Sequence, residues 1–354
     1  MKPSFHPLII KDIIKETSDA VSVSFEVPAE LKSSFSYKSG QYLTLKAIIN
    51  GEDVRRSYSL CSAPHEDSWK VAIKAIDAGK FSNFANNELK KGDFLEVMNP
   101  MGSFVLPQEI ENKNFVFFAV GSGVTPVLSM IKSVLAESID ATITFFYGNK
   151  GFASIIFREE IEALKNKYMD RLRVIHVLSR ESLGNAIQKG RIDGQKCNDL
   201  INAFVPVETI DAVFICGPKE MIFAVRDTFV AKGLNEKSIH YELFTSGDTP
   251  VKQDVSKQED AISSLVTVIV DGEVLEIPLK SNDINILDAA LQAGADLPFA
   301  CKGGVCCTCK AKIVEGTAKM DVNYALEADE VEAGYILTCQ SHPTSEKLIV
   351  SFDE

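Results

Sequence analysis

Residues 301–309 read CKGGVCCTC, and one more cysteine, Cys339, lies beyond a further 29 residues. Three thiols therefore lie in one short loop with the spacing C-x4-C-x2-C, and a fourth comes from a later segment. The two adjacent glycines let the backbone of such a loop wrap closely around a group at its centre. The pattern predicts that four thiolates converge on a small inorganic core.

The spacing is typical of a plant-type [2Fe–2S] site, in which each iron takes two thiolates. A structural zinc site usually has two short cysteine pairs or a mixture of cysteine and histidine, and a disulfide framework needs a secretory context. Both alternatives are therefore disfavoured, and we interpret Cys307 as a small buried residue inside the loop. A cluster moves one electron at a time, so the rest of the chain must supply electrons. The predicted ligands are Cys301, Cys306, Cys309 and Cys339.

Composition limits the class of protein. A chain of 354 residues suggests two or three domains, and 45% hydrophobic with 24% charged residues is typical of a globular protein. The net charge of −12 argues against binding to nucleic acid. No apolar run approaches the ~20 residues of a membrane span, and the first residues lack the apolar core of a signal peptide. We therefore expect a cytoplasmic protein.

Residues 1–107 predict a small antiparallel β-barrel. Short segments alternate apolar and polar residues, as half-buried strands do, and Asn50-Gly51 supplies a hairpin turn. The expected strands are residues 20–27, 41–48, 57–62, 70–76 and 93–98.

Residues 113–245 predict an α/β domain with a parallel sheet. Continuous apolar runs, the pattern of strands buried on both faces, alternate with helical patterns. The expected strands are residues 115–120, 141–147, 172–178, 212–216 and 239–243, and the expected helices are residues 126–136, 154–168 and 219–232.

The last part of the chain predicts a linker and a third domain. Residues 246–264 are polar, without an amphipathic period, and are expected to be the linker. In residues 265–354, a hairpin around Asp271-Gly272 and a helix over residues 285–294 precede the cysteine loop. This order predicts an α+β ferredoxin module of the β-grasp type.

Two motifs in the first domain suit a flavin nucleotide. In residues 56–59, RSYS, an arginine can pair with a phosphate, a tyrosine can stack on a flat ring, and a serine can hydrogen-bond a ring nitrogen. In residues 79–84, GKFSNF, backbone amides at a helix start can bind a pyrophosphate. Each motif is short, and an exposed arginine beside a strand tyrosine is a common alternative.

Two motifs in the second domain suit a dinucleotide. Residues 121–126, GSGVTP, follow the first buried strand and open a helix, which predicts a phosphate-binding turn, although the last position departs from G-x-G-x-x-G. Proline suits the first helical turn because its missing N–H costs no bond. Residues 216–218, CGP, end the fourth buried strand, where ligands of open α/β sheets bind. An ordinary tight turn and a buried structural thiol are the alternatives.

The order of these motifs, followed by the plant-type cysteines, resembles the ferredoxin–NADP reductase superfamily. It looks most like the members with a C-terminal [2Fe–2S] domain, the electron-transfer components of bacterial oxygenases. The resemblance covers nearly the whole chain. It implies FAD in the barrel, a nicotinamide dinucleotide on the α/β domain, and an NAD(P)H-dependent oxidoreductase that passes electrons through the cluster to a partner.

The resemblance also implies roles for single residues. Catalytic roles beside flavin N5 and nicotinamide C4, or in flavin protonation, fall to Ser59, Cys216 and Glu242. Flavin contacts are implied for Arg56, Tyr58, Ser59, Lys74, Gly79, Phe81, Ser82 and Phe244. Contacts with the nicotinamide nucleotide are implied for Gly121, Gly123, Thr125, Pro126, Cys216, Gly217 and Pro218.

The pair Ser179-Arg180, at the end of the third buried strand, indicates whether the nucleotide is NADPH or NADH. NADP-dependent members of the family carry a Ser-Arg pair there for the 2′-phosphate, and Arg191 could assist because arginine pairs bidentately with such a dianion. No acidic residue that would hold a ribose 2′-OH is evident. We therefore expect NADPH, with NADH possible. A solvent-facing pair that touches only the adenosine is the alternative.

The partner is implied by finer resemblance. The cysteine loop and residues 324–340 look closest to the reductase subunits of di-iron epoxidases that act on phenylacetyl-CoA in phenylacetate catabolism. Other implied partners are a Rieske ring-hydroxylating oxygenase, a desaturase and the hybrid-cluster protein. A hypothesis of another class is a cluster carrier with a degenerate reductase half. The intact Arg56, Ser59, Gly121 and Cys216 disfavour it.

Overall fold

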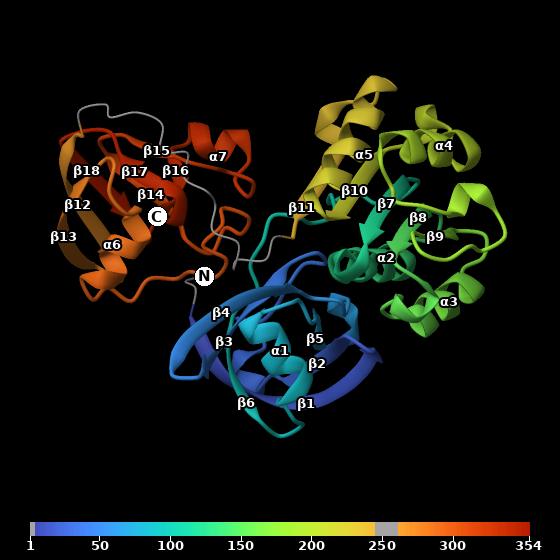
Figure 1. Ribbon diagram of the computed structural model, residues 1–354, viewed down its shortest axis with the longest axis horizontal. Coiled ribbons are helices and arrows are strands. Elements are labelled where there is room, and N and C mark those ends of the chain that lie inside the picture. The colour runs from blue at the N-terminus through green and yellow to red at the C-terminus, as the bar shows by residue number, and fades with distance from the viewer. Residues whose placement is uncertain (1–3, 245–260) are drawn as a thin grey trace. The chain divides into compact units, whose positions relative to one another are not determined.

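The computed structural model describes residues 4–244 and 261–354. These residues form two compact units, a larger one built mainly from residues 5–244 and a smaller one from residues 261–354 (Figure 1). No helix within the described ranges has both the length and the apolar character that crossing a bilayer requires.

The first sheet confirms the predicted antiparallel barrel-like domain. Its strand order is β4-β3-β6-β1-β2-β5, and the two edge strands meet where Leu60, just after β4, bridges to Val71 of β5. The strands are β1 (Phe5–Thr17), β2 (Ala20–Glu26), β3 (Tyr42–Ile49), β4 (Glu52–Ser59), β5 (Trp69–Lys74) and β6 (Phe94–Met98). One helix, α1 (Lys80–Asn87), lies against this sheet (Figure 1).

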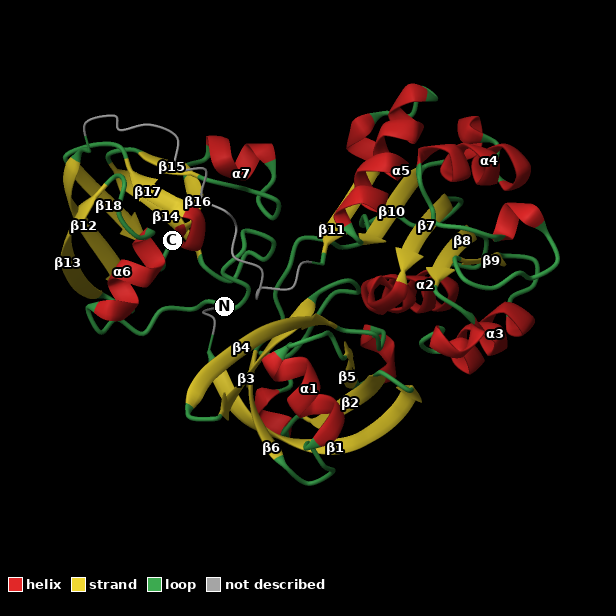
Figure 2. Ribbon diagram, viewed as in Figure 1, coloured by secondary structure: helices red, strands yellow, loops and turns green. Residues whose placement is uncertain are grey.

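The second sheet confirms the predicted parallel sheet, with the order β11-β10-β7-β8-β9. Figure 2 shows α2 and α3 on one side of it and α4 and α5 on the other. The chain reverses its direction of progress between β7 and β10, and ligands of open α/β sheets bind at the carboxyl ends of strands at such a point. The strands are β7 (Asn114–Val120), β8 (Thr142–Asn149), β9 (Leu172–Leu178), β10 (Ala212–Gly217) and β11 (Ile239–Leu243), and the helices are α2 (Val124–Glu137), α3 (Arg158–Lys167), α4 (Gly194–Phe204) and α5 (Lys219–Ala231).

Helix α3 begins later than its sequence pattern predicts. It starts at Arg158 rather than at residue 154, because Phe157 takes a left-handed conformation with φ of 58° that ends the preceding turn. Helix α4 was not predicted, and Asp193 begins it by accepting a hydrogen bond from the amide of Lys196.

One buried cluster joins the parallel sheet to the barrel. Helix α2 is buried from Val124 to Leu135, and the cluster around it includes Cys61, Ala72 and Phe104 from the barrel side. A helix that begins at the predicted phosphate-binding turn is thus packed directly on the domain predicted to hold the flavin.

The smaller unit has a mixed sheet of order β13-β12-β18-β14-β16, in which β12 pairs in parallel with β18. The hairpin at Asp271 and Gly272 is present, and both residues have positive φ. Residues 246–260 of the predicted linker lie outside the described residues, and the first strand begins at Ser263. The elements are β12 (Ser263–Val270), β13 (Glu273–Lys280), α6 (Ile286–Gln292), β14 (Lys310–Glu315), β15 (Ala318–Met320), α7 (Ala328–Glu332), β16 (Tyr335–Leu337), β17 (Ser341–Pro343) and β18 (Lys347–Ser351).

Candidate cofactor sites

Three predicted catalytic residues come together at the carboxyl end of the parallel sheet. Cys216 of β10 lies directly beside Glu242 of β11 in the strand register. Ser59, the last residue of β4, donates its hydroxyl hydrogen to Oε2 of Glu242 over 3.2 Å. The barrel and the α/β domain therefore meet through side chains at this point.

The protonation of this group follows from its burial. Part of Glu242 is solvent-accessible, but its carboxyl group is enclosed, and burial raises its pKa to about 8 against the lowering effect of the Ser59 hydrogen bond. Burial and the neighbouring Glu242 hold the pKa of the Cys216 thiol well above its ordinary value. At neutral pH, Glu242 can therefore hold a proton, and Cys216 is a neutral thiol rather than a nucleophile.

The predicted phosphate-binding turn is shaped by close backbone approach. Gly121 has φ of 58°, and a Cβ atom at Gly123 would lie 2.2 Å from the carbonyl oxygen of Cys216. Thr125 donates to the carbonyl of Ser122 at 3.0 Å, and α2 begins at Val124. The turn therefore brings the start of α2 close to the end of β10, and the positive end of the helix dipole favours an anion there.

Four further predicted site residues lie at or next to the ends of elements in the α/β domain. Pro126 occupies the first turn of α2, where its lack of an N–H costs no hydrogen bond. Gly217 has φ of 155° and ends β10, and Pro218 precedes the first residue of α5. Phe244, at the end of β11, packs partly buried against the core of the α/β domain.

The predicted flavin residues lie on three neighbouring elements of the barrel. Arg56 and Tyr58 belong to β4, and the Tyr58 ring lies 5.7 Å from that of Phe81 on α1. Phe81 is buried in the barrel core, so its main contact is with protein. Lys74, the last residue of β5, has its ammonium 3.5 Å from Asp19.

The start of α1 is organised by local bonds. The Ser82 hydroxyl accepts from the amide of Ile76 at 3.3 Å and donates to the carbonyl of Gly79 at 3.5 Å. A Cβ atom at Gly79 would lie 2.4 Å from that hydroxyl, so the tight turn into α1 depends on glycine. The turn before α1 therefore places backbone amides where the sequence motif predicts a pyrophosphate site.

The predicted 2′-phosphate residues are brought close by backbone bonds. The amides of Ser179 and Arg180 donate to the carbonyls of Asn149 and Lys150, at 2.9 and 2.8 Å. The amide of Gly190 donates to the carbonyl of Leu178 at 3.0 Å, which sets Arg191 near the same end of β9. Arg180 and Arg191 are both exposed there, and a guanidinium group suits a dianion such as a phosphate.

The four predicted ligand cysteines of the smaller unit are grouped as two pairs. The sulfurs of Cys301 and Cys306 lie 3.1 Å apart, and Cys309 and Cys339 are hydrogen-bonded to each other. Among the described residues, no three side chains of His, Cys, Asp or Glu converge as they would around a single ion. Two pairs suit two irons, each with two thiolates, so the residues fit a [2Fe–2S] cluster.

Donors around the sulfurs also suit thiolate ligands. The amide of Gly303 donates to the Cys301 sulfur at 3.3 Å, and Nε2 of Gln340 lies 3.6 Å from the Cys339 sulfur. The Cys306 thiol and the nearby amides lower the pKa of Cys301 to about 6, against the opposing effect of burial. Hydrogen bonds of this kind tune the potential of a bound cluster.

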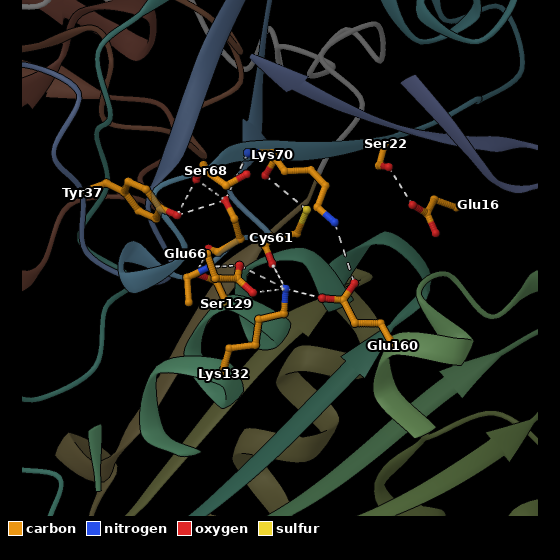
Figure 3. Close-up of polar contacts among 12 residues, drawn as sticks. Glu16, Ser22, Tyr37, Cys61, Glu66, Ser68, Lys70, Ser129, Lys132 and Glu160 are labelled. Atoms are coloured by element: carbon orange, nitrogen blue, oxygen red, sulfur yellow. Dashed lines mark hydrogen bonds and ion pairs between the residues drawn. The ribbon is translucent and has the colours of Figure 1, made fainter. Parts of the chain in front are cut away.

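A polar cluster between the barrel and α2 was not predicted from sequence (Figure 3). Its centre is the buried Lys132, whose ammonium meets Glu66 and Glu160. The one trace of it in the sequence is a lysine within a mostly apolar helix, and nothing in the sequence indicates the partners. Asn149, at the end of β8, was also missed, and it is buried with both amide atoms lacking a hydrogen-bond partner in the described structure.

Models of three domain families match the chain in the order of the described sheets. They are the oxidoreductase FAD-binding domain over residues 7–106, the oxidoreductase NAD-binding domain over residues 117–227, and the 2Fe-2S iron-sulfur cluster binding domain over residues 268–344. The predicted FAD, NAD(P)H and [2Fe–2S] cofactors are confirmed by these matches.

Two relatives match over nearly their whole length. A 1,2-phenylacetyl-CoA epoxidase subunit from Escherichia coli K12 is 42% identical over 99% of this chain and 98% of its own. The ferredoxin reductase component of 3-ketosteroid-9-alpha-monooxygenase from Rhodococcus rhodochrous is 35% identical over 98% of this chain and 96% of its own. Both are components of oxygenase systems by name.

Solved structures confirm the fold. Phthalate dioxygenase reductase superposes with a TM-score of 0.61 at 24% identity and covers 98% of both chains. An intact type IV self-sufficient cytochrome P450 monooxygenase superposes with a TM-score of 0.72 at 22% identity, covering 98% of this chain and 41% of its own.

Proposed function

The chain belongs to the ferredoxin–NADP reductase superfamily, among the reductase components of oxygenase systems that carry a 2Fe-2S domain, and we propose that its electron acceptor is a di-iron epoxidase acting on phenylacetyl-CoA. The general function of the protein follows from its membership of this family. The protein is an NAD(P)H-dependent flavin and iron–sulfur oxidoreductase that transfers electrons to an oxygenase.

One observation carries the choice of partner. The identity with the phenylacetyl-CoA epoxidase component from Escherichia coli is 42%, against 35% with the ketosteroid monooxygenase component, and both alignments span nearly whole chains. A reductase must dock on its oxygenase, so similarity that extends through the cluster domain favours a similar docking partner. The ketosteroid relative supports a monooxygenase that acts on a ketosteroid as the second candidate.

We assign hydride transfer to the junction of Ser59, Cys216 and Glu242. When bound, the flavin takes the two electrons of a hydride and releases them one at a time to the cluster. The Ser59 hydroxyl and the protonated Glu242 provide a donor and a proton at this place, and the neutral Cys216 adds no charge. The protein's main task is to place the two rings in contact and exclude water.

We assign the remaining cofactor contacts to the residues around this junction. The start of α2 would hold the nucleotide phosphates, and β4 with the start of α1 would hold the FAD. Arg180 and Arg191 would hold a 2′-phosphate, which favours NADPH. The cluster ligands would be Cys301, Cys306, Cys309 and Cys339.

We also propose that the protein works in the cytoplasm. All eight cysteines are free thiols, and a reducing compartment keeps such thiols available as ligands. A fractionation of the native host cells, with antibody against this chain, tests the location.

Reconstitution with purified oxygenases tests the partner. The chain is mixed with NADPH and either a phenylacetyl-CoA epoxidase or a 3-ketosteroid-9-alpha-monooxygenase, each with its own substrate, and oxygenated product is measured. We expect product with the epoxidase at a rate at least about tenfold above the other pair. Equal rates, or a faster ketosteroid reaction, would contradict the proposed partner while leaving the reductase function intact.

A further inference from the structure

The ammonium of Lys132 lies buried where α2 meets the barrel. Its side chain is 5% exposed, on a helix that is buried from Val124 to Leu135. A buried ammonium is costly to desolvate unless it is paired and hydrogen-bonded. Its partners are therefore informative about what the charge is for.

Lys132 joins three segments that are distant in sequence (Figure 3). Its Nζ forms ion pairs with Glu160 on α3 and with Glu66, at 3.2 Å, in the turn after β4. It also donates to the carbonyl oxygen of Cys61 at 3.3 Å. Although burial alone would lower it, Glu160 and Glu66 hold the pKa of Lys132 above its ordinary value, so the charge is kept.

A second bond ties the same helix to the same barrel segment. The Ser129 hydroxyl, one turn before Lys132 on α2, donates to the carbonyl oxygen of Ser62 at 2.6 Å. The acceptors of both bonds, Cys61 and Ser62, follow Ser59 by two and three residues along the chain. The segment that presents Ser59 to Glu242 is therefore the segment held by α2.

The other charged groups near Lys132 are also held by partners, as expected if α2 and the barrel keep a fixed position. Lys70 of β5 lies 3.9 Å from Glu160 and 5.6 Å from the centre of the Phe157 ring. Glu16 of β1 accepts a hydrogen bond from Ser22 at 2.6 Å, and burial raises the pKa of its carboxyl group. Glu66 also accepts from the amide of Ala63 at 2.8 Å, so its carboxylate is held from the barrel side. If the charge of Lys132 were removed, Glu66 and Glu160 would face each other across the boundary between the domains.

We propose that Lys132, with Ser129, is a positioning residue for hydride transfer. The two side chains fix α2, whose first turn is the assigned phosphate-binding turn, against the barrel segment that carries Ser59. The distance between the nicotinamide and the flavin is then set by this contact as well as by the pocket around the rings. The inference rests on the proposed positions of Ser59 and the phosphate-binding turn, and it does not depend on which oxygenase accepts the electrons.

The physical basis is the sensitivity of hydride transfer to distance. The hydride leaves C4 of the nicotinamide and arrives at the flavin with both electrons of the broken bond, so the oxidised nicotinamide and the reduced flavin balance the step. A misplacement of about 1 Å can cost about a hundredfold in rate. A small shift of α2 against the barrel would thus slow the step while leaving each cofactor bound to its own domain.

The test compares Lys132→Met with Lys113→Met in the FAD-loaded full-length protein. Lys113 belongs to the same domain and forms an exposed ion pair with Asp211 at 3.2 Å, so its variant controls for the loss of a lysine charge. Stopped-flow absorbance follows flavin reduction by saturating NADPH, with protonated or C4-deuterated nucleotide. FAD content and the thermal midpoint are measured in parallel.

For Lys132→Met we expect the limiting rate of flavin reduction to fall by about ten- to a hundredfold, with a larger isotope effect and a nucleotide Kd within about threefold of the native value. Lys113→Met should keep the native rate. A rate within twofold of the native value in Lys132→Met, even with a lowered thermal midpoint, would mean that the contact only stabilises the fold and would overturn the proposal.

Two further variants test the positioning role if Lys132→Met does not fold or loses FAD. Ser129→Ala removes one bond without exposing a charge, and it should slow the limiting rate by about three- to tenfold with FAD retained. Lys132→Arg keeps the charge and should retain more of the rate than Ser129→Ala. Native limiting rates and native isotope effects in both variants would overturn the proposal.

Discussion

The hydroxyl of Ser59 donates to Oε2 of Glu242 over 3.2 Å, so the last residue of β4 is bonded to the last strand of the parallel sheet. This bond lowers the pKa of Glu242, and burial raises it more strongly, to about 8. The carboxyl group is therefore protonated at neutral pH, and both stability and flavin reduction should depend on its titration.

The first prediction concerns stability. An unfolded chain has Glu242 near its ordinary pKa of 4.5, against about 8 when folded, so the folded state holds the extra proton between these values. The stabilisation is complete below pH 4.5 and is lost as the pH rises towards 8. The full shift would correspond to about 5 kcal/mol, and partial exposure reduces this to roughly 1–3 kcal/mol.

Thermal unfolding at a series of pH values from 5 to 8.5 measures this dependence. The free energy of unfolding of the native protein should fall relative to that of Glu242→Gln as the pH rises, because glutamine does not titrate. Glu109→Gln, at an exposed position, should run parallel to the native curve. A Glu242→Gln curve that also runs parallel would show that Glu242 is ionised in the folded protein.

The second prediction concerns the hydrogen bond itself. Ser59→Ala removes the donor that lowers the pKa of Glu242, so that pKa should rise further. The inflection in the pH profile of flavin reduction should move to higher pH, and the rate at neutral pH should fall by up to about tenfold, the equivalent of one ordinary hydrogen bond. Stopped-flow reduction over a pH series measures both. An unmoved inflection with a slower rate would assign Ser59 to flavin contact without an effect on Glu242.

The third prediction concerns the approach of Gly123 to β10. A Cβ atom at Gly123 would lie 2.2 Å from the carbonyl oxygen and 2.6 Å from the carbonyl carbon of Cys216, and backbone atoms cannot yield as a flexible side chain can. Gly123→Ala should displace the turn and raise the nucleotide Kd by about tenfold or more, while FAD stays bound. Gly194→Ala is the matched control, because its nearest neighbour, the Thr228 hydroxyl, would be 3.7 Å away. Titration of nucleotide into each variant distinguishes them, and equal affinities would contradict the prediction.

The central strands of the parallel sheet could be predicted because they are buried on both faces. Strands β7 and β10 match the predicted residues to within one position at one end, since a continuous apolar run marks such strands clearly. The long strand β1 was missed because Ile9 and Ile14 face solvent, which hides the alternation between buried and exposed positions.

The residues of the candidate sites also differ in how well the sequence could predict them. The pairing of Ser59 with Glu242 joins residues 183 positions apart, and only the family resemblance, not the local pattern, suggested that both were functional. The environment of Lys132 could not be predicted at all. A lysine in an apolar helix is compatible with many surroundings, and its partners Glu66 and Glu160 belong to segments with no local sign of contact.

The fourth prediction concerns nucleotide choice. Arg180 is exposed beside the end of β9, where a 2′-phosphate would lie. Arg180→Ala should raise the KM for NADPH by about ten- to a hundredfold through loss of a charged hydrogen bond, with little change for NADH. Arg173→Ala is the control, because that guanidinium donates to the carbonyl of Phe204 near the opposite end of the same strand. A loss of equal size for both nucleotides would assign Arg180 to the shared adenosine part.

The fifth prediction separates the flavin from the cluster. Cys309 is paired with Cys339 and is a predicted ligand, whereas its neighbour Cys307 is not a predicted ligand, so the two cysteines offer a matched comparison. Cys309→Ser should lose the cluster and its electron delivery to cytochrome c or an oxygenase, because one iron would lack a thiolate. Reduction of ferricyanide by the flavin should remain, since the proposed site of hydride transfer lies within the larger unit.

Iron content, the visible spectrum and the two reductase assays measure this division. Cys307→Ser should keep both iron and cytochrome c reduction near native levels, which excludes a general effect of altering the loop. If Cys309→Ser lost ferricyanide reduction as well while FAD remained bound, the cluster would take part in flavin reduction and the assigned electron path would be wrong. If Cys307→Ser lost its iron while Cys309→Ser kept it, the ligand set itself would need to change.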